Sequence, residues 1–434
     1  MEQVSGELEL MRRLGWRLLP LLILIFLVAF IDRQNVGFAK LQMLTDLHIS
    51  EASYGFGASL FFLGYVMFEV PSCLGLQRYG ARIWLARLTF SWGLVTLLLA
   101  CTSSAAMFYV LRFLLGAAEA GFYPGAVFYI SLWFPEPYRI RMLGFFSIGS
   151  SLGNMFGALI NGVLLGADGT LGLRGWQWVF IGSGIVALLL TAIVLRYLPS
   201  SRDDAHFLSR EDREHLAAAH ARQPAPINVQ GSPWSALWDP VVIGFGLIYV
   251  LQATAFYGVT YWLPTIVRAF GVSSAINGLL NMIPWALSAA ALIIVPRFVR
   301  NDRAVFRTIS GTTLLGAMCF VASLLLANNT LRFLALAIGG PCIALLNPLF
   351  WIFPPRFLSG VRAAAGIAAI NSIGNLGGFL AQNLAPWVER RTGSVDAPML
   401  VPAVCLFAIC AGSVVLYMRS VRPGTDPIGH QHQL

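Results

Sequence analysis

Charged side chains are scarce in this sequence of 434 residues, where Asp, Glu, Lys and Arg together make up 11%. Soluble domains carry about 25% charged residues, so the deficit excludes an ordinary soluble fold. Hydrophobic residues account for 57% of the chain, and the mean hydropathy is +0.72. This composition is typical of a helical protein that crosses a membrane many times.

Motifs for enzymatic, metal or nucleic-acid chemistry are missing as well. The six cysteines form no C-x-x-C pair, and the six histidines fall in tails or connections, so we expect buried thiols and no metal site. No Ser/His/Asp or nucleotide-binding motif occurs, and we predict neither an enzyme nor a cofactor. The net charge of +9 does not indicate nucleic-acid binding, because its distribution follows membrane topology.

Apolar runs close to the roughly 20 residues that a helix needs to cross a bilayer recur along the chain. We predict an all-α polytopic membrane protein with twelve membrane-spanning helices. Their expected ranges are 17–40, 54–76, 84–102, 105–134, 142–166, 177–197, 240–268, 277–297, 307–327, 331–354, 363–386 and 399–419. The basic start resembles a signal peptide, but no small-x-small cleavage site follows, so we expect an uncleaved first helix.

Basic residues are distributed unevenly between the two sides of these helices. Most of the 29 Lys plus Arg residues lie in the N-terminal tail, the even-numbered connections and the C-terminal tail. Because such residues stay on the cytoplasmic side, we expect both termini in the cytoplasm. The long connection 198–238 mixes both charge signs and then proline and glycine, so it predicts a partly helical cytoplasmic linker.

This linker separates two six-helix bundles, predicted over 1–197 and 239–420, with a cytoplasmic tail over 421–434. The bundles repeat one pattern: RFLLGAAEAG at 112 matches RFLALAIGGP at 332, and SSLGNMFG at 150 matches NSIGNLGG at 371. Both copies run in the same direction, so they form a parallel, pseudo-symmetric repeat. Because two such bundles make up the major facilitator fold, which binds cargo near the bilayer midplane, the repeat predicts a transporter.

Ionisable residues are rare inside the predicted spans, and all of them belong to the N-terminal half. A charge near the bilayer centre costs at least roughly 2.5–3.5 kcal/mol, so each is a functional candidate. The C-terminal half offers uncharged polar residues instead, among them Asn371 and Asn375. A cavity lined in this way suits a charged, hydroxylated or aromatic solute. The five ionisable residues are Asp32, Arg33, Glu69, Arg112 and Glu119. For Glu69, near the inner end of its span, a structural role is favoured.

Spacing constrains how these charges can pair. Arg112 and Glu119 are seven residues apart, on one helix face and roughly 10 Å apart along the axis, which favours separate partners; a structural ion pair is the alternative. Asp32 and Arg33 are adjacent and point about 100° apart, so at most one faces a central cavity; snorkelling toward the interface is the alternative. Arginine suits carboxylate recognition, and a partly buried carboxylate suits proton uptake.

The sequence resembles the anion:cation symporter family of the major facilitator superfamily, which includes bacterial permeases for sugar acids, tartrate and phthalate. The resemblance covers almost the whole chain. It is carried by FIDRQNVGFA (30–39), YGFGASLFFLGYVMFEVPS (54–72), QRYGARIW (77–84), RFLLGAAEAGFYPG (112–125), WFP (133–135), YWLPTIV (261–267) and INSIGNLGG (370–378).

The resemblance implies roles for particular residues. Asp32 and Glu119 would take up protons, and a gating loop would contain Arg78, Gly80 and Arg82, although Gln77 replaces the usual Asp of that loop. The residues that it implies for binding the substrate anion are Arg33, Arg112, Tyr123, Asn371 and Asn375.

We therefore expect a proton-coupled symporter that imports an organic carboxylate, such as a sugar acid, hydroxy acid or aromatic acid, by alternating access. We expect it to lie in the bacterial inner membrane and to act as a monomer. Its partners would be the small organic anion, protons and the lipid bilayer, with no cofactor beyond the proton gradient. The alternatives are a facilitator or exporter of another solute with the same fold, and a transporter-like nutrient sensor.

Overall fold

The computed structural model describes residues 2–200, 204–205, 207–221, 239–299, 302–357 and 361–421, and these residues contain helices, turns and connections but no strand. An apolar segment in a bilayer can satisfy its backbone N–H and C=O groups only within itself, which is why such segments fold as helices. The chain divides into two compact units: Met1–Gly231 with Leu263–Met282, and Ser232–Trp262 with Ile283–Leu434.

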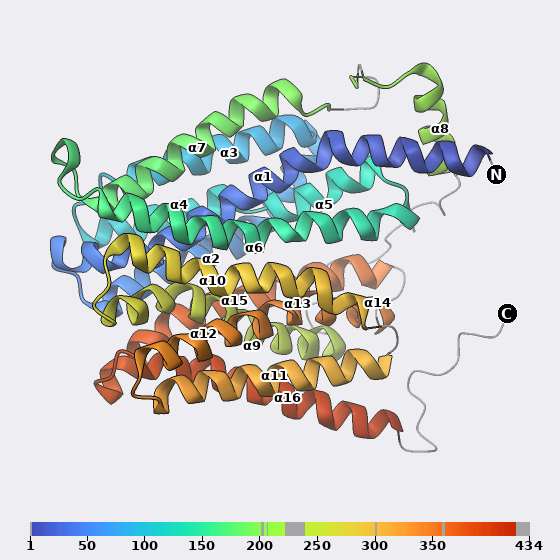
Figure 1. Ribbon diagram of the computed structural model, residues 1–434. Coiled ribbons are helices and arrows are strands. Elements are labelled where there is room, and N and C mark those ends of the chain that lie inside the picture. Colours follow the sequence, from blue (N-terminus) through green and yellow to red (C-terminus); the bar gives the residue numbers. More distant parts are fainter. Residues whose placement is uncertain are drawn as a thin grey trace. The chain divides into compact units, whose positions relative to one another are not determined.

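In the first unit the long helices pack in pairs (Figure 1). α1 packs along α6 and α7, α2 packs along α4, and α3 packs against both α4 and α7. The helix bounds are α1 (Glu2–Asp46), α2 (Glu51–Tyr79), α3 (Ala81–Leu99), α4 (Ala105–Glu119), α5 (Phe122–Trp133), α6 (Glu136–Gly166), α7 (Gly175–Tyr197) and α8 (Arg210–Ala221), with the short η1 (Thr170–Gly172) before α7.

In the second unit α11 packs against α12 and α16. The helices α9 (Pro240–Ala269) and α10 (Ser274–Ile294) contribute residues to both units. The remaining bounds are η3 (Val295–Arg297), α11 (Asp302–Leu325), α12 (Asn329–Ala344), α13 (Leu346–Phe350), α14 (Pro354–Phe357), α15 (Val361–Thr392), η4 (Ala397–Met399) and α16 (Leu400–Val421).

Eleven spans in the described part of the chain are long and apolar enough to cross a membrane. α15 is a further long helix of 32 residues. With α15, the structure accounts for the twelve spans that the sequence predicts. The first of them is longer than expected, because α1 begins at Glu2 and ends at Asp46.

Two of the predicted spans are interrupted. The span predicted at 105–134 is divided into α4 and α5 because Pro124 has no N–H and its ring would clash with the carbonyl of Ala120, four residues earlier. Gly121 turns the chain there with a φ of 85°, and a Cβ at this position would lie 2.2 Å from Ser72 Oγ. The span predicted at 331–354 is similarly divided, since α12 ends four residues before Pro348.

Close packing of α6 against α1 depends on glycines at every fourth position of α6. Gly149, Gly153 and Gly157 all face α1, and a Cβ on Gly153 would come within 2.5 Å of the Leu27 carbonyl oxygen. Glycine therefore permits the close approach, as small residues do between membrane helices. In the second unit Gly374 of α15 makes a comparable approach to Tyr249 of α9.

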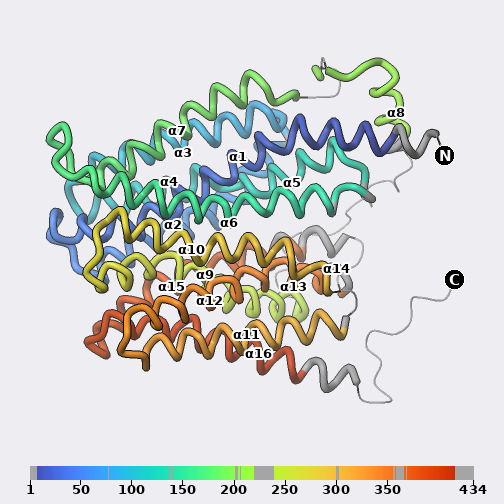
Figure 2. The backbone as a smooth tube through the Cα atoms, in the orientation of Figure 1, coloured from blue at the N-terminus to red at the C-terminus, as the bar shows by residue number. Residues whose placement is uncertain are grey.

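The predicted linker 198–238 contains α8, which lies beside the N-terminal end of α1 (Figure 2). Arg13 Nη2 of α1 donates to Asp212 Oδ1 of α8 at 2.8 Å, which ties the two helices together. Residues 222–238 of the linker and 422–434 of the predicted tail lie outside the described residues.

Candidate functional site

The first feature of the site is a buried ion pair between α1 and α4. Arg33 Nη2 lies 2.6 Å from Glu119 Oε1, and Arg33 Nε donates to the same oxygen at 2.7 Å. The Glu119 side chain is 1% exposed and that of Arg33 is 11% exposed. The expectation that Glu119 and Arg112 have separate partners is confirmed for Glu119, although spacing did not indicate Arg33 as its partner.

Arg112 of α4 is fully buried and faces α2. Its Nη2 donates to the Ala58 carbonyl oxygen at 3.1 Å, and its Cζ lies 5.0 Å from the centroid of the Phe61 ring. Arg33 Cζ lies 5.4 Å from that same centroid and 5.2 Å from that of Tyr65. The two guanidinium groups therefore share one aromatic neighbour, and contacts of this kind stabilise a cation where water is excluded.

Sequence reasoning did not assign Phe61 and Tyr65 to the site. They are four residues apart in FFLGY, so they share a face of α2. Two aromatic residues on one helix face, in a span that packs beside helices with buried charges, could have indicated these two residues.

Asp32 lies next to Arg33 in sequence but turns toward α3 and α7. Its Oδ1 accepts hydrogen bonds from Asn35 Nδ2 and Thr96 Oγ1, each at 3.0 Å. Ser183 of α7 donates to Asn35 Oδ1 at 3.2 Å and so extends the network. The two neighbours thus point to different helices, as their 100° separation predicts, and the side chain of Asp32 is buried.

Each of the two buried acids keeps one oxygen that forms no hydrogen bond within the described part of the chain. These atoms are Asp32 Oδ2 and Glu119 Oε2. A buried polar atom without a partner is unfavourable by roughly 1–3 kcal/mol. Both oxygens can accept a proton, and a carboxyl group that takes one up no longer carries a buried charge.

Tyr123 lies at the start of α5, in an aromatic cluster with Phe26 of α1 and Phe146 of α6. The centroid of the Tyr123 ring lies 5.8 Å from that of Phe26 and 5.9 Å from that of Phe146. The rings of Phe26 and Phe146 stack on each other, with their centroids 4.6 Å apart. The cluster connects the break between α4 and α5 to the glycine-rich helix α6. Tyr123 is thus a few residues beyond Glu119, on the far side of the helix break.

In the second unit the predicted asparagines lie one turn apart on α15. Both are half-buried, and Asn375 Nδ2 donates to the Asn371 carbonyl oxygen at 3.1 Å. A second contact between uncharged polar groups joins α9 to α13, where Gln252 donates to Asn347 Oδ1 at 3.3 Å. These groups contain both donors and acceptors, as expected for a polar lining.

The predicted gating loop is a one-residue connection between α2 and α3. Gly80 supplies it with φ 79° and ψ 156°, a conformation that is essentially restricted to glycine. Arg82 donates to the Leu195 carbonyl oxygen near the end of α7, and the Cζ of the exposed Arg78 lies 5.4 Å from the Tyr79 ring centroid. The loop is therefore connected to α7 as well as to its own two helices.

A metal centre is not built from the residues that the structure describes, since no three His, Cys, Asp or Glu side chains gather there. Among the residues that the sequence predicts for the site, the buried guanidiniums of Arg33 and Arg112 can bind an anion, and the carboxyl groups of Asp32 and Glu119 can bind a proton.

Comparison with known proteins gives a consistent family. The chain matches the Major Facilitator Superfamily over residues 22–382. It is 38% identical to a quinolone resistance transporter of Acinetobacter baumannii over 99% of both chains. It is 36% identical to a putative tartrate transporter of Agrobacterium vitis, over 99% of this chain and 96% of the other.

Solved structures agree on the fold. The D-xylose-proton symporter superposes with a TM-score of 0.71 at 14% identity, over 91% of this chain and 96% of the other. At this identity the likeness concerns the fold alone, and it confirms the predicted all-α architecture of twelve membrane helices.

Proposed function

Because the chain belongs to the Major Facilitator Superfamily, and is therefore a multi-pass membrane transporter and not an enzyme, we propose that it imports an organic carboxylate together with protons. The observation that carries this proposal is the Arg33–Glu119 pair, in which a buried acid occupies the guanidinium that an external carboxylate would need. Protonation of the acid removes a negative charge beside Arg33, and a bound anion supplies one, so the two events compensate each other at such a pair.

Protonation of Glu119 is the first step. A proton on its free Oε2 neutralises the acid, weakens the contact through Oε1 and removes the negative charge of Glu119 that faces Arg33. A substrate carboxylate then restores the balance by accepting the paired N–H groups of the guanidinium. Substrate binding and protonation are thereby favourable only together.

Asp32 is the second proton acceptor in this account. Asn35 and Thr96 hold Oδ1, so that Oδ2 is the oxygen at which the proton is gained and lost. The carboxyl group keeps its orientation through the cycle, because the two donors stay in place. This arrangement supports a proton site that is separate from the Arg33–Glu119 pair.

The anion would be held by Arg33 and Arg112, with Tyr123, Asn371 and Asn375 contacting its uncharged groups. Two guanidiniums suit a substrate with more than one anionic or polar oxygen, and the 36% identity to a putative tartrate transporter supports a carboxylate of this kind. The loop of Arg78, Gly80 and Arg82 would control the conformational change of alternating access.

The same proposal places the protein in the bacterial inner membrane as a monomer, with both termini in the cytoplasm. Relatives from bacteria and the excess of arginine in the tails and even-numbered connections support this location and orientation. The proton gradient would drive the cycle, with no cofactor.

Export of a different solute is the second candidate. The observation that favours it is the 38% identity to a quinolone resistance transporter over 99% of both chains. Exchange of an outgoing solute for incoming protons would use the same two acids, so the direction of solute movement relative to the protons distinguishes the two functions.

The test uses purified protein in proteoliposomes. A thermal-shift screen against tartrate, sugar acids and aromatic acids first selects a ligand, whose labelled form is then supplied outside vesicles with an alkaline interior. Accumulation above the external concentration that a protonophore abolishes is the expected result. Equilibration without accumulation would indicate a facilitator, exclusion from the lumen an exporter, and binding without flux a sensor.

A further inference from the structure

The N-terminal end of α1 extends well beyond the length that a bilayer requires. Its 45 residues correspond to about 67 Å at about 1.5 Å per residue, roughly twice the thickness of the hydrocarbon core. One face of this end is buried in the first unit through Leu10, Leu14 and Leu18. The opposite face is exposed and is available to contact lipid and water.

The exposed face changes in character along the helix axis. After the exposed Leu8 and Glu9 it carries the guanidiniums of Arg12 and Arg13, continues through Trp16, which is 79% exposed, and becomes apolar again at Leu24, which is 40% exposed. Tryptophan favours the boundary between headgroups and acyl chains. The sequence of side chains therefore indicates that Trp16 lies at the membrane surface, with the arginines on its headgroup side and Leu24 on its acyl-chain side.

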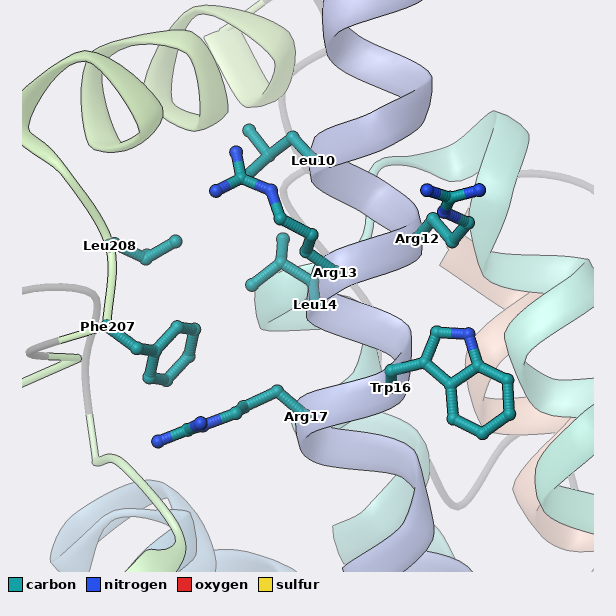
Figure 3. Close-up of a pocket in the computed structure, with 8 residues that line it drawn as sticks. All are labelled: Leu10, Arg12, Arg13, Leu14, Trp16, Arg17, Phe207 and Leu208. Atoms are coloured by element: carbon teal, nitrogen blue, oxygen red, sulfur yellow. The ribbon is translucent and has the colours of Figure 1, made fainter.

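A pocket of about 580 Å³ lies at this level, between α1 and the linker segment that precedes α8. Figure 3 shows Arg13, Leu14 and Arg17 turned toward Phe207 and Leu208, while Arg12 and Trp16 occupy the other flank of α1. The lining consists of Leu10, Arg12, Arg13, Leu14, Trp16, Arg17, Phe207 and Leu208. Its floor is apolar, and its rim is cationic.

The rim has more positive than negative charge. Asp212 accepts from Arg13 at 2.8 Å and compensates that guanidinium. Arg17 Cζ lies 5.1 Å from the Phe207 ring centroid, a contact that positions the guanidinium without neutralising it. None of the pocket-lining residues is acidic, so a ligand here would meet a cationic site beside an apolar surface.

We propose that this pocket binds the phosphate headgroup of an anionic phospholipid. Guanidinium groups form paired hydrogen bonds with phosphate oxygens, and basic pockets beside membrane helices take up anionic headgroups. The apolar floor accepts the glycerol end, and the acyl chains continue along Leu24, which lies on the same flank of α1 as Arg13 and Arg17. A free phosphate ion would use the arginines but not this apolar path, which is why the geometry fits a lipid better than a soluble anion.

The bound headgroup bridges α1 and the linker. It contacts Arg13 and Arg17 on α1 and lies against Phe207 and Leu208 on the linker, so lipid binding adds to the Arg13–Asp212 contact that holds α8 in place. The proposal concerns a site at the end of α1 and does not depend on the identity of the transported solute.

Delipidated full-length protein in a neutral detergent provides the test, with thermal unfolding as the readout. Short-chain phosphatidylglycerol, short-chain phosphatidylcholine and inorganic phosphate are titrated separately. The variant R17Q removes the guanidinium beside Phe207 but keeps Arg13 and its ion pair. The matched control is R391Q, which removes one exposed arginine beside the exposed Trp387 on α15.

Phosphatidylglycerol is expected to raise the unfolding temperature of the wild type and of R391Q, and to do so less at high salt. In R17Q its apparent affinity should fall about fivefold, corresponding to roughly 1 kcal/mol for one arginine. An equal effect of phosphatidylcholine, an equal effect of inorganic phosphate, or a full phosphatidylglycerol shift in R17Q would overturn the proposal. If R17Q does not fold, F207A removes the ring beside Arg17 and should weaken the phosphatidylglycerol shift in the same way; a full shift in F207A would overturn the proposal.

Discussion

Arg33 and Glu119 illustrate, at the scale of single residues, how a buried ion pair can serve function more than stability. Desolvation of the two charges offsets most of their attraction, whereas removing one partner alone costs about 3–5 kcal/mol. The 2.6 Å contact between them therefore contributes little net stability but responds strongly to a proton on Glu119. Phe61 and Tyr65, which contact Arg33, supply a setting in which the guanidinium stays charged.

Arg112→Lys tests the anion site. Lysine keeps the positive charge but loses the planar pair of N–H donors that fits a carboxylate, so the affinity for the transported anion should fall at least about tenfold, or roughly 1.4 kcal/mol. Binding titration of the purified variant measures this loss, with thermal unfolding recorded to verify the fold.

The repeat offers a matched control for that variant. Arg332 occupies the position equivalent to Arg112 in the second half, where it pairs with Asp396 and donates to the Ser323 carbonyl oxygen. Arg332→Lys should leave the affinity for the anion unchanged. If Arg112→Lys also binds the anion as tightly as the wild type, Arg112 is not part of the anion site.

Thr96→Val tests the support of Asp32. The valine removes the hydroxyl that donates to Asp32 Oδ1 at 3.0 Å, and a hydrogen bond to a charged group is worth about 1.5–3 kcal/mol. We expect the initial rate of gradient-driven uptake to fall about tenfold and Thr96→Ser to restore it. Thr191→Val removes a neighbouring hydroxyl bonded to Thr89 and should behave as the wild type. Wild-type uptake by Thr96→Val would exclude the positioning role.

At the scale of elements, the break between α4 and α5 places Glu119 at a helix end. Its position depends on Gly121, which combines a φ of 85° with a Cβ site 2.2 Å from Ser72 Oγ. Glycine tolerates both conditions, and any other residue would have to move the backbone. The break thus allows the end of α4 and the start of α5 to be positioned separately around the acid.

Gly121→Ala should therefore reduce stability, by about 1–3 kcal/mol for the strained backbone and more if Ser72 cannot move. The control is Gly144→Ala on α6, where a Cβ would meet nothing within 4 Å and φ is ordinary; alanine in such a helix interior is favourable by roughly 0.5–1 kcal/mol. Thermal unfolding of the two purified variants compares them. Equal unfolding temperatures would show that the break does not require glycine.

The docking of α8 should depend on pH through Asp212. Burial acts to raise the pKa of Asp212, but hydrogen bonds from the backbone and side chain of Ser209 and the charge of Arg13 outweigh it, so the pKa lies below its ordinary value. Because its pKa is depressed in the folded protein, the Asp212 carboxylate stabilises the docking of α8 at pH values above about 3.9, the pKa of an Asp in the unfolded chain. This stabilisation is lost as the pH falls through the pKa of Asp212 in the folded protein.

Pepsin cleavage within α8 measures this dependence. With each rate divided by the rate of pepsin on an unfolded peptide at the same pH, we expect cleavage to be slow at pH 5 and to accelerate as the pH falls below about 4. Asp212→Asn should already be cleaved faster at pH 5. Glu214→Gln alters an exposed acid of the same helix, paired with Arg210, and should keep the wild-type profile. A rate for Asp212→Asn that matches the wild type at pH 5 would show that the ion pair does not hold α8.

At the scale of the whole molecule, the fold was largely predictable and the site only partly. The apolar runs predict the membrane helices, because helix formation in a bilayer depends on local composition. The motif repeated at 112 and 332 predicts two related halves. The partner of Glu119 depends on the packing of α1 against α4, which no spacing within one helix reveals. The break after Glu119 was detectable from Pro124, whereas the extension of α1 to Glu2 lies in a charged segment that hydropathy does not mark.

Coupling of protons to the organic anion is the central claim, and proton movement measured with a pH electrode tests it most directly. Proteoliposomes in weakly buffered medium receive the carboxylate selected by thermal shift, and the external pH is followed. We predict that the medium becomes alkaline as the anion enters with wild-type protein or Glu214→Gln, and that Glu119→Gln produces no such change. Anion entry without a pH change, acidification of the medium, or a wild-type response from Glu119→Gln would contradict the account.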